Sequence, residues 1–238
     1  MRELNLGTLH ARIVGGTDRE GGGTGPVVIL LHGYGAPGTD LVPLWRELKV
    51  PPDVRFVFPE APLELGFGGR AWWTLDMLRL QDRFDRGLVE ELIREVPAGL
   101  AAAREAVLEL LKGLERELGL VPETTILGGF SQGAMLATDV VLRSDRKFAA
   151  LAVLSGTVIC KDEWRALMPA RRGLPVLQSH GRSDAVLPFF LAEQLRDELT
   201  AAGLLVEFVP FNAGHGIAGP VLDGLGALAT RVAASKTP

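Results

Sequence analysis

The sequence predicts an α/β protein in which a mostly parallel central sheet is flanked by helices on both faces. Short apolar runs rich in Val, Ile, Leu and Phe alternate with longer segments of helical periodicity, which is typical of such a sheet. Most of these runs are apolar throughout, as strands buried on both faces are. The chain has 238 residues, of which 47% are hydrophobic, so we expect a single domain over 1–238.

Six short apolar segments are predicted to be strands of this sheet. They are 26–33, 54–62, 124–130, 148–156, 174–181 and 205–214. An earlier segment, 6–16, predicts an additional antiparallel strand at the edge of the sheet. The "GGGTG" that follows it indicates a turn.

Helices are predicted between the strands, at 40–49, 76–94, 97–118, 132–143, 188–202 and 219–234. The clearest is 97–118, where Leu and Val recur at three- and four-residue spacing and Pro97 suits the first turn. Gly119 directly after it predicts the end of the helix. Residues 63–80 are rich in glycine and aromatic side chains without one period, so we expect a lid or pocket loop there.

Charge and cysteine content exclude several classes of function. The 25 basic and 29 acidic residues are interspersed and give a net charge of −4, so we expect no nucleic-acid partner. Cys160 is the only cysteine, which excludes an intrachain disulfide and a cysteine-based metal site. The N-terminal residues lack the apolar core of a secretory signal. No apolar run approaches the length of about 20 residues that a membrane-spanning helix needs. We therefore expect a cytoplasmic protein without a membrane span, whose oligomeric state the sequence leaves open.

The motif "GFSQG" at 129–133 places Ser131 between a predicted strand and a predicted helix. A serine nucleophile presented above a sheet needs this strained strand-to-helix turn, with glycines where side chains would collide. The helix N-terminus behind the serine favours developing negative charge. Taken alone, the motif also fits an ordinary turn, because a chain with 29 glycines contains such spacings by chance.

A serine hydroxyl attacks a carbonyl only when a base takes its proton. In enzymes that present a serine nucleophile on such a strand-to-helix turn, the catalytic acid and then the histidine come later in the chain. Asp184 follows the penultimate predicted strand, and His215 follows the last one in "NAGHGI". The predicted catalytic triad is therefore Ser131, Asp184 and His215. Four other aspartates between Ser131 and His215 are predicted at helical or surface positions. They are Asp139, Asp145, Asp162 and Asp197.

Acyl transfer also needs backbone donors for the oxyanion that develops on the carbonyl. The N–H of Gln132, directly after the serine, is one predicted donor, and the N–H of Tyr34 in "LLHGYGAPGTD" is the other. His32 is interpreted as a structural residue that orients this loop rather than as a base. His180 is interpreted as a hydrogen-bonded loop anchor.

Four segments resemble the phospholipase/carboxylesterase family of α/β-hydrolases, which includes the acyl-protein thioesterases. They are "LLHGYGAPGTDL", "LGGFSQGAM", "SHGRSDAVLPF" and "NAGHGI", and "GGRAWWTLD" is similar to the family's aromatic segment near the active site. The resemblance implies the α/β-hydrolase fold and a serine esterase or thioesterase that needs no cofactor or metal. It implies the same triad and the same two oxyanion donors. It also implies that Val186, Trp72 and Trp73 line the substrate site.

The chain departs from the family pattern in three places. Ala134 stands where relatives usually have a third glycine, and "TVICKDEW" follows Gly156 where many relatives have a Pro-containing pocket segment. The insertion "GFGGRAWWTLDMLRLQDRF" is long. The last two departures concern the shape of the acyl pocket.

From these features we expect a serine carboxylesterase that hydrolyses small-molecule esters of small to medium acyl chains through an acyl-enzyme. An acyl-protein thioesterase or a lysophospholipase-like hydrolase would use the same residues on a different substrate. A serine peptidase of this fold is a weaker hypothesis, because the chain has no additional domain to gate peptides. A non-catalytic binding module on the same fold is the alternative of another class.

Overall fold

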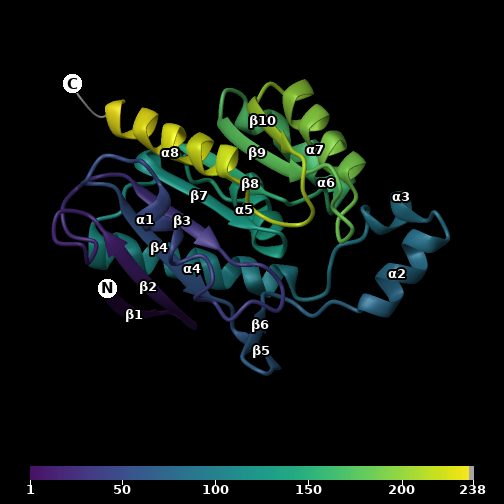
Figure 1. Cartoon of the computed structure of the whole chain (residues 1–238), viewed down its shortest axis with the longest axis horizontal. Coiled ribbons are helices and arrows are strands. Elements are labelled where there is room, and N and C mark those ends of the chain that lie inside the picture. The colour runs from purple at the N-terminus through teal and green to yellow at the C-terminus, as the bar shows by residue number, and fades with distance from the viewer. Residues whose placement is uncertain (236–238) are drawn as a thin grey trace.

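The computed structural model describes residues 1–235 and contains an eight-stranded sheet (Figure 1). Its strands are β1 (Arg2–Leu6), β2 (Leu9–Gly15), β3 (Val27–Leu31), β4 (Arg55–Glu60), β7 (Thr125–Phe130), β8 (Ala150–Leu154), β9 (Pro175–Gly181) and β10 (Leu205–Phe211). They lie in the order β1-β2-β4-β3-β7-β8-β9-β10. The six strands from β4 to β10 are parallel, whereas β1 and β2 are antiparallel to their neighbours. The predicted mostly parallel sheet is confirmed.

Helices cover both faces of the sheet, as predicted. They are α1 (Leu44–Glu47), α2 (Met77–Asp85), α3 (Val89–Leu92), α4 (Leu100–Leu118), α5 (Gln132–Arg143), α6 (Lys161–Leu167), α7 (Phe189–Ala201) and α8 (Gly219–Ala234). Two short 3₁₀ turns lie at Pro122–Thr124 and Met168–Arg171. Helices α4 to α7 pack against one face of the sheet, and α1 and α8 pack against the other.

The central strand β3 shows why its sequence is apolar throughout. Val27, Ile29 and Leu31 belong to the core under α4 and α5, whereas Val28 and Leu30 belong to the core under α8. Successive side chains of a strand point to opposite faces, so a strand covered on both faces needs apolar residues at every position. The carboxyl ends of the parallel strands then lie along one edge of the sheet, and the loops that follow them carry the candidate site.

The edge of the sheet differs from the prediction. The segment 6–16 was expected to supply an antiparallel edge strand, but β2 pairs with both β1 and β4 and is therefore internal. The edge strand on this side of the sheet is β1, whose sequence "RELNL" alternates polar and apolar residues and is partly exposed. Such a half-exposed strand has no continuous apolar run, so it lacks the sequence pattern that indicates the buried strands.

Residues 63–80 are more regular than the predicted loop. β5 (Leu63–Gly66) and β6 (Gly69–Ala71) form an antiparallel hairpin whose two turn residues, Phe67 and Gly68, both have positive φ. Positive φ at both positions is the type I′ geometry, for which Asn-Gly or Asp-Gly is the usual sequence. Phenylalanine in the first position hides that signal. The hairpin projects from the body below β3 and β4 in Figure 1.

Several helices also differ in extent. The predicted helix 76–94 is divided into α2 and α3, with Gly87, a poor helix former, between them. The predicted helix 40–49 shrinks to the four residues of α1. Helix α4 begins at Leu100, three residues after Pro97, and ends before Gly119 as predicted. Helix α6 was not predicted, because seven residues are too short to show a clear helical period.

Candidate active site

Ser131 lies in a strained turn between β7 and α5. Its φ of 54° and ψ of −118° are rare for a residue other than glycine and cost about 1–3 kcal/mol. A Cβ on Gly133 would lie 2.1 Å from the carbonyl oxygen of Leu31, and one on Gly129 would lie 2.5 Å from the carbonyl carbon of Gly133. Both positions therefore exclude side chains. The N–H of Ser131 donates to the carbonyl of Leu154 at 2.9 Å, which ties the turn to the end of β8.

Asp184 and His215, from the loops after β9 and β10, are in direct contact. His215 Nδ1 lies 2.7 Å from Asp184 Oδ2. A carboxylate at this distance from Nδ1 assigns the ring proton to that nitrogen and leaves Nε2 able to accept a proton. Asp184 is itself oriented, because its Oδ1 accepts from the N–H groups of Val186 and Leu187 at 2.9 and 2.8 Å. Asp184 thus fixes the tautomer of His215.

The two halves of the site meet at the carboxyl edge of the sheet. The rings of Phe130 and His215 have centroids 4.8 Å apart, and Phe130 is the neighbour of Ser131 in the chain. No hydrogen bond joins the Ser131 hydroxyl to His215 within residues 1–235.

The two predicted oxyanion donors come from different loops. Gln132 is the first residue of α5, where a backbone N–H has no partner inside the helix. Tyr34 lies in the loop after β3, and this loop pairs with the hairpin through Gly35 N–H to Arg70 O at 2.8 Å and Arg70 N–H to Ala36 O at 3.0 Å. The hairpin therefore braces the loop that carries Tyr34. Within the described chain neither the Gln132 nor the Tyr34 N–H has an acceptor.

His32 is a buried structural residue at the start of this loop, as predicted. Its Nδ1 lies 2.8 Å from Gly33 O, and its Nε2 accepts from the N–H of Ala61 at 2.9 Å. Both ring nitrogens are therefore engaged by backbone, which leaves neither for proton transfer. Burial lowers the pKa of His32 and favours the neutral ring that this bonding requires.

Trp72 and Trp73 lie behind the oxyanion loop. They are 2% and 1% exposed, so in this structure neither ring offers surface to a substrate. Trp72 Nε1 donates to His32 O at 2.9 Å. The Gln132 side chain accepts from Trp72 N–H at 3.0 Å and donates to Trp73 O at 2.8 Å. The sequence predicted only the backbone of Gln132 as functional; no local signal marks its side chain as the clamp of this segment.

His180 and Val186 flank Asp184. His180 is fully buried, and its Nε2 donates to Leu187 O at 2.8 Å, with Asp184 Oδ2 at 3.2 Å. It anchors the loop that carries Asp184, in agreement with its interpretation from the sequence. Burial lowers its pKa as well. Val186 is about half exposed beside Asp184, where it is accessible to a ligand.

The buried histidines predict a pH dependence of stability. Because burial lowers the pKa of His32 and His180 in the folded state, the unfolded chain binds more protons below about pH 6.5. The two histidines contribute fully to the free energy of unfolding above that pH, and this contribution is lost as the pH falls. The free energy of unfolding then decreases by up to about 1.4 kcal/mol per pH unit for each histidine. Denaturant unfolding between about pH 7.5 and 5.5 measures this slope. His32→Asn, which keeps a donor for Gly33 O, is expected to reduce the slope of the unfolding free energy against pH. An identical slope in the variant would contradict the lowered pKa of His32.

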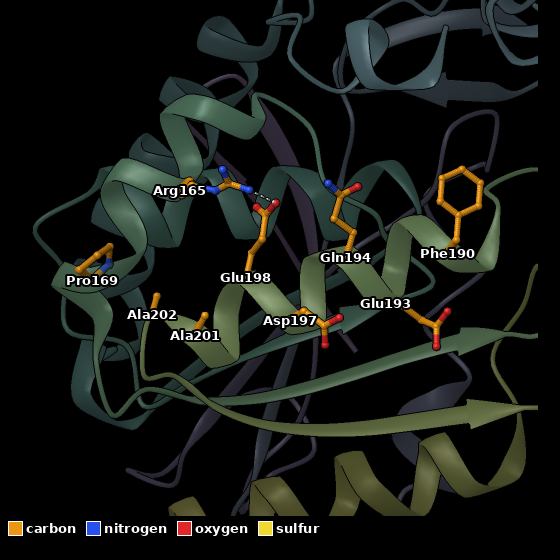
Figure 2. A pocket seen from close by; sticks show the side chains of 9 residues that line it. All are labelled: Arg165, Pro169, Phe190, Glu193, Gln194, Asp197, Glu198, Ala201 and Ala202. Carbon is orange, nitrogen blue, oxygen red and sulfur yellow. Dashed lines mark hydrogen bonds and ion pairs between the residues drawn. The ribbon is translucent and has the colours of Figure 1, made fainter. Parts of the chain in front are cut away.

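A groove of about 710 Å³ lies between α6 and α7 (Figure 2). Arg165 and Glu198 form an ion pair at 2.8 Å on one side of it, and Phe190 lies near the other end. Asp197, which also lines the groove, is paired with Arg196. None of the candidate catalytic residues lines this groove, so it is separate from the candidate active site.

Residues 1–235 contain neither a cluster of metal-binding side chains nor a membrane-spanning helix. No three His, Cys, Asp or Glu side chains gather there where they could hold a metal ion. No helix in that range is long and apolar enough to cross a membrane.

Comparisons with known proteins connect this geometry to a family. The family model described as Phospholipase/Carboxylesterase matches residues 19–225. The chain is 28% identical to acyl-protein thioesterase 1 of Neurospora crassa over 83% of each protein. It is 26% identical to acyl-protein thioesterase 1 of Emericella nidulans, over 78% of this chain and 80% of that protein.

Two solved structures are also similar to this chain. The crystal structure of esterase PE8 is 29% identical and superposes with a TM-score of 0.77, covering 96% of this chain and 100% of the other. The carboxylesterase from Mesorhizobium loti, at 20% identity, has the same fold, with a TM-score of 0.74 over 95% and 96% of the two chains. The sheet order, the strand-to-helix turn at Ser131 and these matches together show that the chain belongs to the phospholipase/carboxylesterase family of α/β-hydrolases.

Proposed function

We propose that this protein is a serine carboxylesterase that hydrolyses carboxylic esters of small to medium acyl chains through an acyl-Ser131 intermediate. The observation that carries the proposal is the 2.7 Å contact between Asp184 and His215 at the sheet edge where Ser131 occupies its strained turn. The contact prepares a neutral imidazole whose free nitrogen can take the serine proton. Membership of an esterase family supports the same chemistry.

The proposed reaction has two halves. His215 Nε2 takes the proton of Ser131 Oγ as that oxygen attacks the ester carbonyl, and the N–H groups of Tyr34 and Gln132 stabilise the oxyanion. The intermediate collapses, the C–O bond to the alcohol breaks, and His215 gives its proton to the leaving oxygen. Water then attacks acyl-Ser131, its proton passes to His215, and the acid leaves as the proton returns to Ser131. Asp184 stabilises the imidazolium in both halves.

A protein-directed thioesterase is the second candidate. Relatives that match about four-fifths of the chain carry the name acyl-protein thioesterase 1. The same residues would act, and a thiolate leaving group, with a pKa near 8.5 as a free thiol, would need less proton donation than an alkoxide. Paired rates on an ester and a thioester of the same acyl group, followed by an S-acylated peptide, separate the two candidates. A strong preference for the acylated peptide would favour the thioesterase.

Initial rates on p-nitrophenyl esters of increasing acyl length test the proposal directly. We expect the rate constant kcat/KM to peak at a short or intermediate chain and to fall for long chains. A lysophospholipid run in the same series is expected to be a poor substrate. A maximum at the longest acyl chain would contradict the chain-length proposal, and the absence of hydrolysis across all esters and thioesters would favour the binding module.

A further inference from the structure

Ser155 occupies a strained and buried position next to the candidate site. It directly follows β8, is fully buried, and has a φ of 50°. Left-handed backbone is unfavourable for residues other than glycine and is often found where geometry serves function. A glycine would take this conformation without strain. The serine therefore contributes something that glycine lacks, and the only group it adds beyond Cβ is its hydroxyl.

That hydroxyl is bonded to the loop that carries His215. Ser155 Oγ donates to the carbonyl oxygen of Gly216 at 2.8 Å, across 61 residues of sequence. On its other side, the N–H of Ser155 donates to Ser179 O at 2.9 Å, so the residue is fixed to β9. Its chain neighbour, Leu154, accepts from the N–H of Ser131. One short stretch thus holds both the serine turn and the carbonyl beside His215.

The His215 loop needs such a tether. His215 is flanked by Gly214 and Gly216, and glycine gives a loop more conformational freedom than any other residue. A Cβ at Gly216 would meet no atom within 4 Å, so the loop is open on that side of the residue. Asp184 holds one end of the imidazole through Nδ1 and the Phe130 ring packs against it, but neither contact holds the backbone that follows His215. A second fixed point on the backbone removes that freedom.

We propose that Ser155 is a positioning residue that holds His215 Nε2 within reach of Ser131 through the Gly216 carbonyl. The inference rests on the proposed function, because it assigns His215 as the base. A purely structural role would predict a loss of stability when the hydroxyl is removed, with a uniform effect on all substrates. A positioning role predicts a selective loss in the steps in which His215 transfers a proton.

Two variants separate the hydroxyl from the backbone strain. Ser155→Ala removes the hydroxyl and keeps the strain, whereas Ser155→Gly removes both. Both are expected to lower kcat by roughly 10- to 100-fold with KM little changed, since small displacements of a catalytic group have effects of this size. The glycine variant is expected to unfold at the same temperature as wild type or above it. Ser179→Ala is the matched control, because that buried hydroxyl has no hydrogen-bond partner among the described residues.

The leaving group provides a readout that a structural role would not change. During acylation His215 must protonate an alkoxide leaving group but not a p-nitrophenolate. Both Ser155 variants are therefore expected to lose a larger factor in kcat/KM on an alkyl ester than on a p-nitrophenyl ester of the same acid. Equal losses on the two esters, or rates like those of Ser179→Ala, would overturn the proposal.

Proton NMR of the His215 ring gives a measurement that does not depend on turnover. The Nδ1 proton shared with Asp184 is expected to exchange with water faster in both Ser155 variants than in wild type and Ser179→Ala. Unchanged exchange in both would overturn the inference. If wild type shows no Ser131-dependent hydrolysis, the proposed function fails, and the exchange rates still decide whether Ser155 holds His215.

Discussion

Ser131→Ala is expected to lower kcat for ester hydrolysis by about 10⁶-fold, because no other group can form the acyl intermediate. The rate that remains would come from the oxyanion donors and substrate binding alone. The loss should leave the fold intact, since alanine keeps the backbone and removes only the hydroxyl. The measurement is kcat on a p-nitrophenyl ester, combined with the unfolding temperature of each variant.

Ser131→Gly supplies the control for this experiment. The serine holds a φ of 54°, which glycine adopts without strain, so the glycine variant is expected to be inactive and more stable than the alanine variant by about 1 kcal/mol. Retention of more than a small fraction of wild-type activity in both variants would mean that Ser131 is not the nucleophile.

Asp184→Asn is expected to lower kcat by about 10⁴-fold, the size of effect known for the same change in other serine hydrolases. The structure explains why the amide would take the harmful orientation. Oδ1 accepts two backbone N–H groups, from Val186 and Leu187, so the amide oxygen must occupy that place. The NH₂ group then faces His215 Nδ1, which must become the acceptor, and the ring proton moves to Nε2. A ring protonated at Nε2 cannot accept the proton of Ser131.

Asp162→Asn is the matched control for Asp184→Asn. Asp162 also lies between the serine and the histidine in the sequence, but its side chain is 58% exposed and pairs with Arg94 at the surface. Its replacement is expected to leave kcat unchanged.

The unfolding temperature of Asp184→Asn should fall little, because the backbone hydrogen bonds to residue 184 persist in this variant. A loss of less than tenfold in Asp184→Asn would contradict the assigned role of Asp184.

The parts of the fold that could be predicted from the sequence are those with a local signal. Strands such as β3 and β7 are short and apolar because they are buried on both faces, and this pattern needs no knowledge of their neighbours. The contact between Asp184 and His215 was also foreseeable, since both residues follow parallel strands that end at one edge. The partly exposed β1 and the seven-residue α6 carry weaker patterns, and the sequence did not reveal them.

The supporting contacts of the site could not be predicted, because they join residues far apart in sequence. The Gln132 side chain bonds the backbone of Trp72 and Trp73 about 60 positions away, and Ser155 bonds Gly216 over a similar separation. Nothing in the sequence around either residue indicates its distant partner. Only the folded chain shows that Trp72 and Trp73 pack behind the oxyanion loop, where their rings are almost fully buried.

Covalent labelling with a fluorophosphonate, followed by intact mass and peptide mapping, tests directly whether Ser131 is an activated nucleophile. We predict one adduct per chain, on Ser131, that is absent in Ser131→Ala and forms much more slowly in Asp184→Asn. The reaction requires an activated serine but no particular acyl chain, so its result does not depend on the natural substrate. No adduct on the wild-type protein, or an adduct on another residue such as Ser155, would contradict the assignment of Ser131 as the nucleophile.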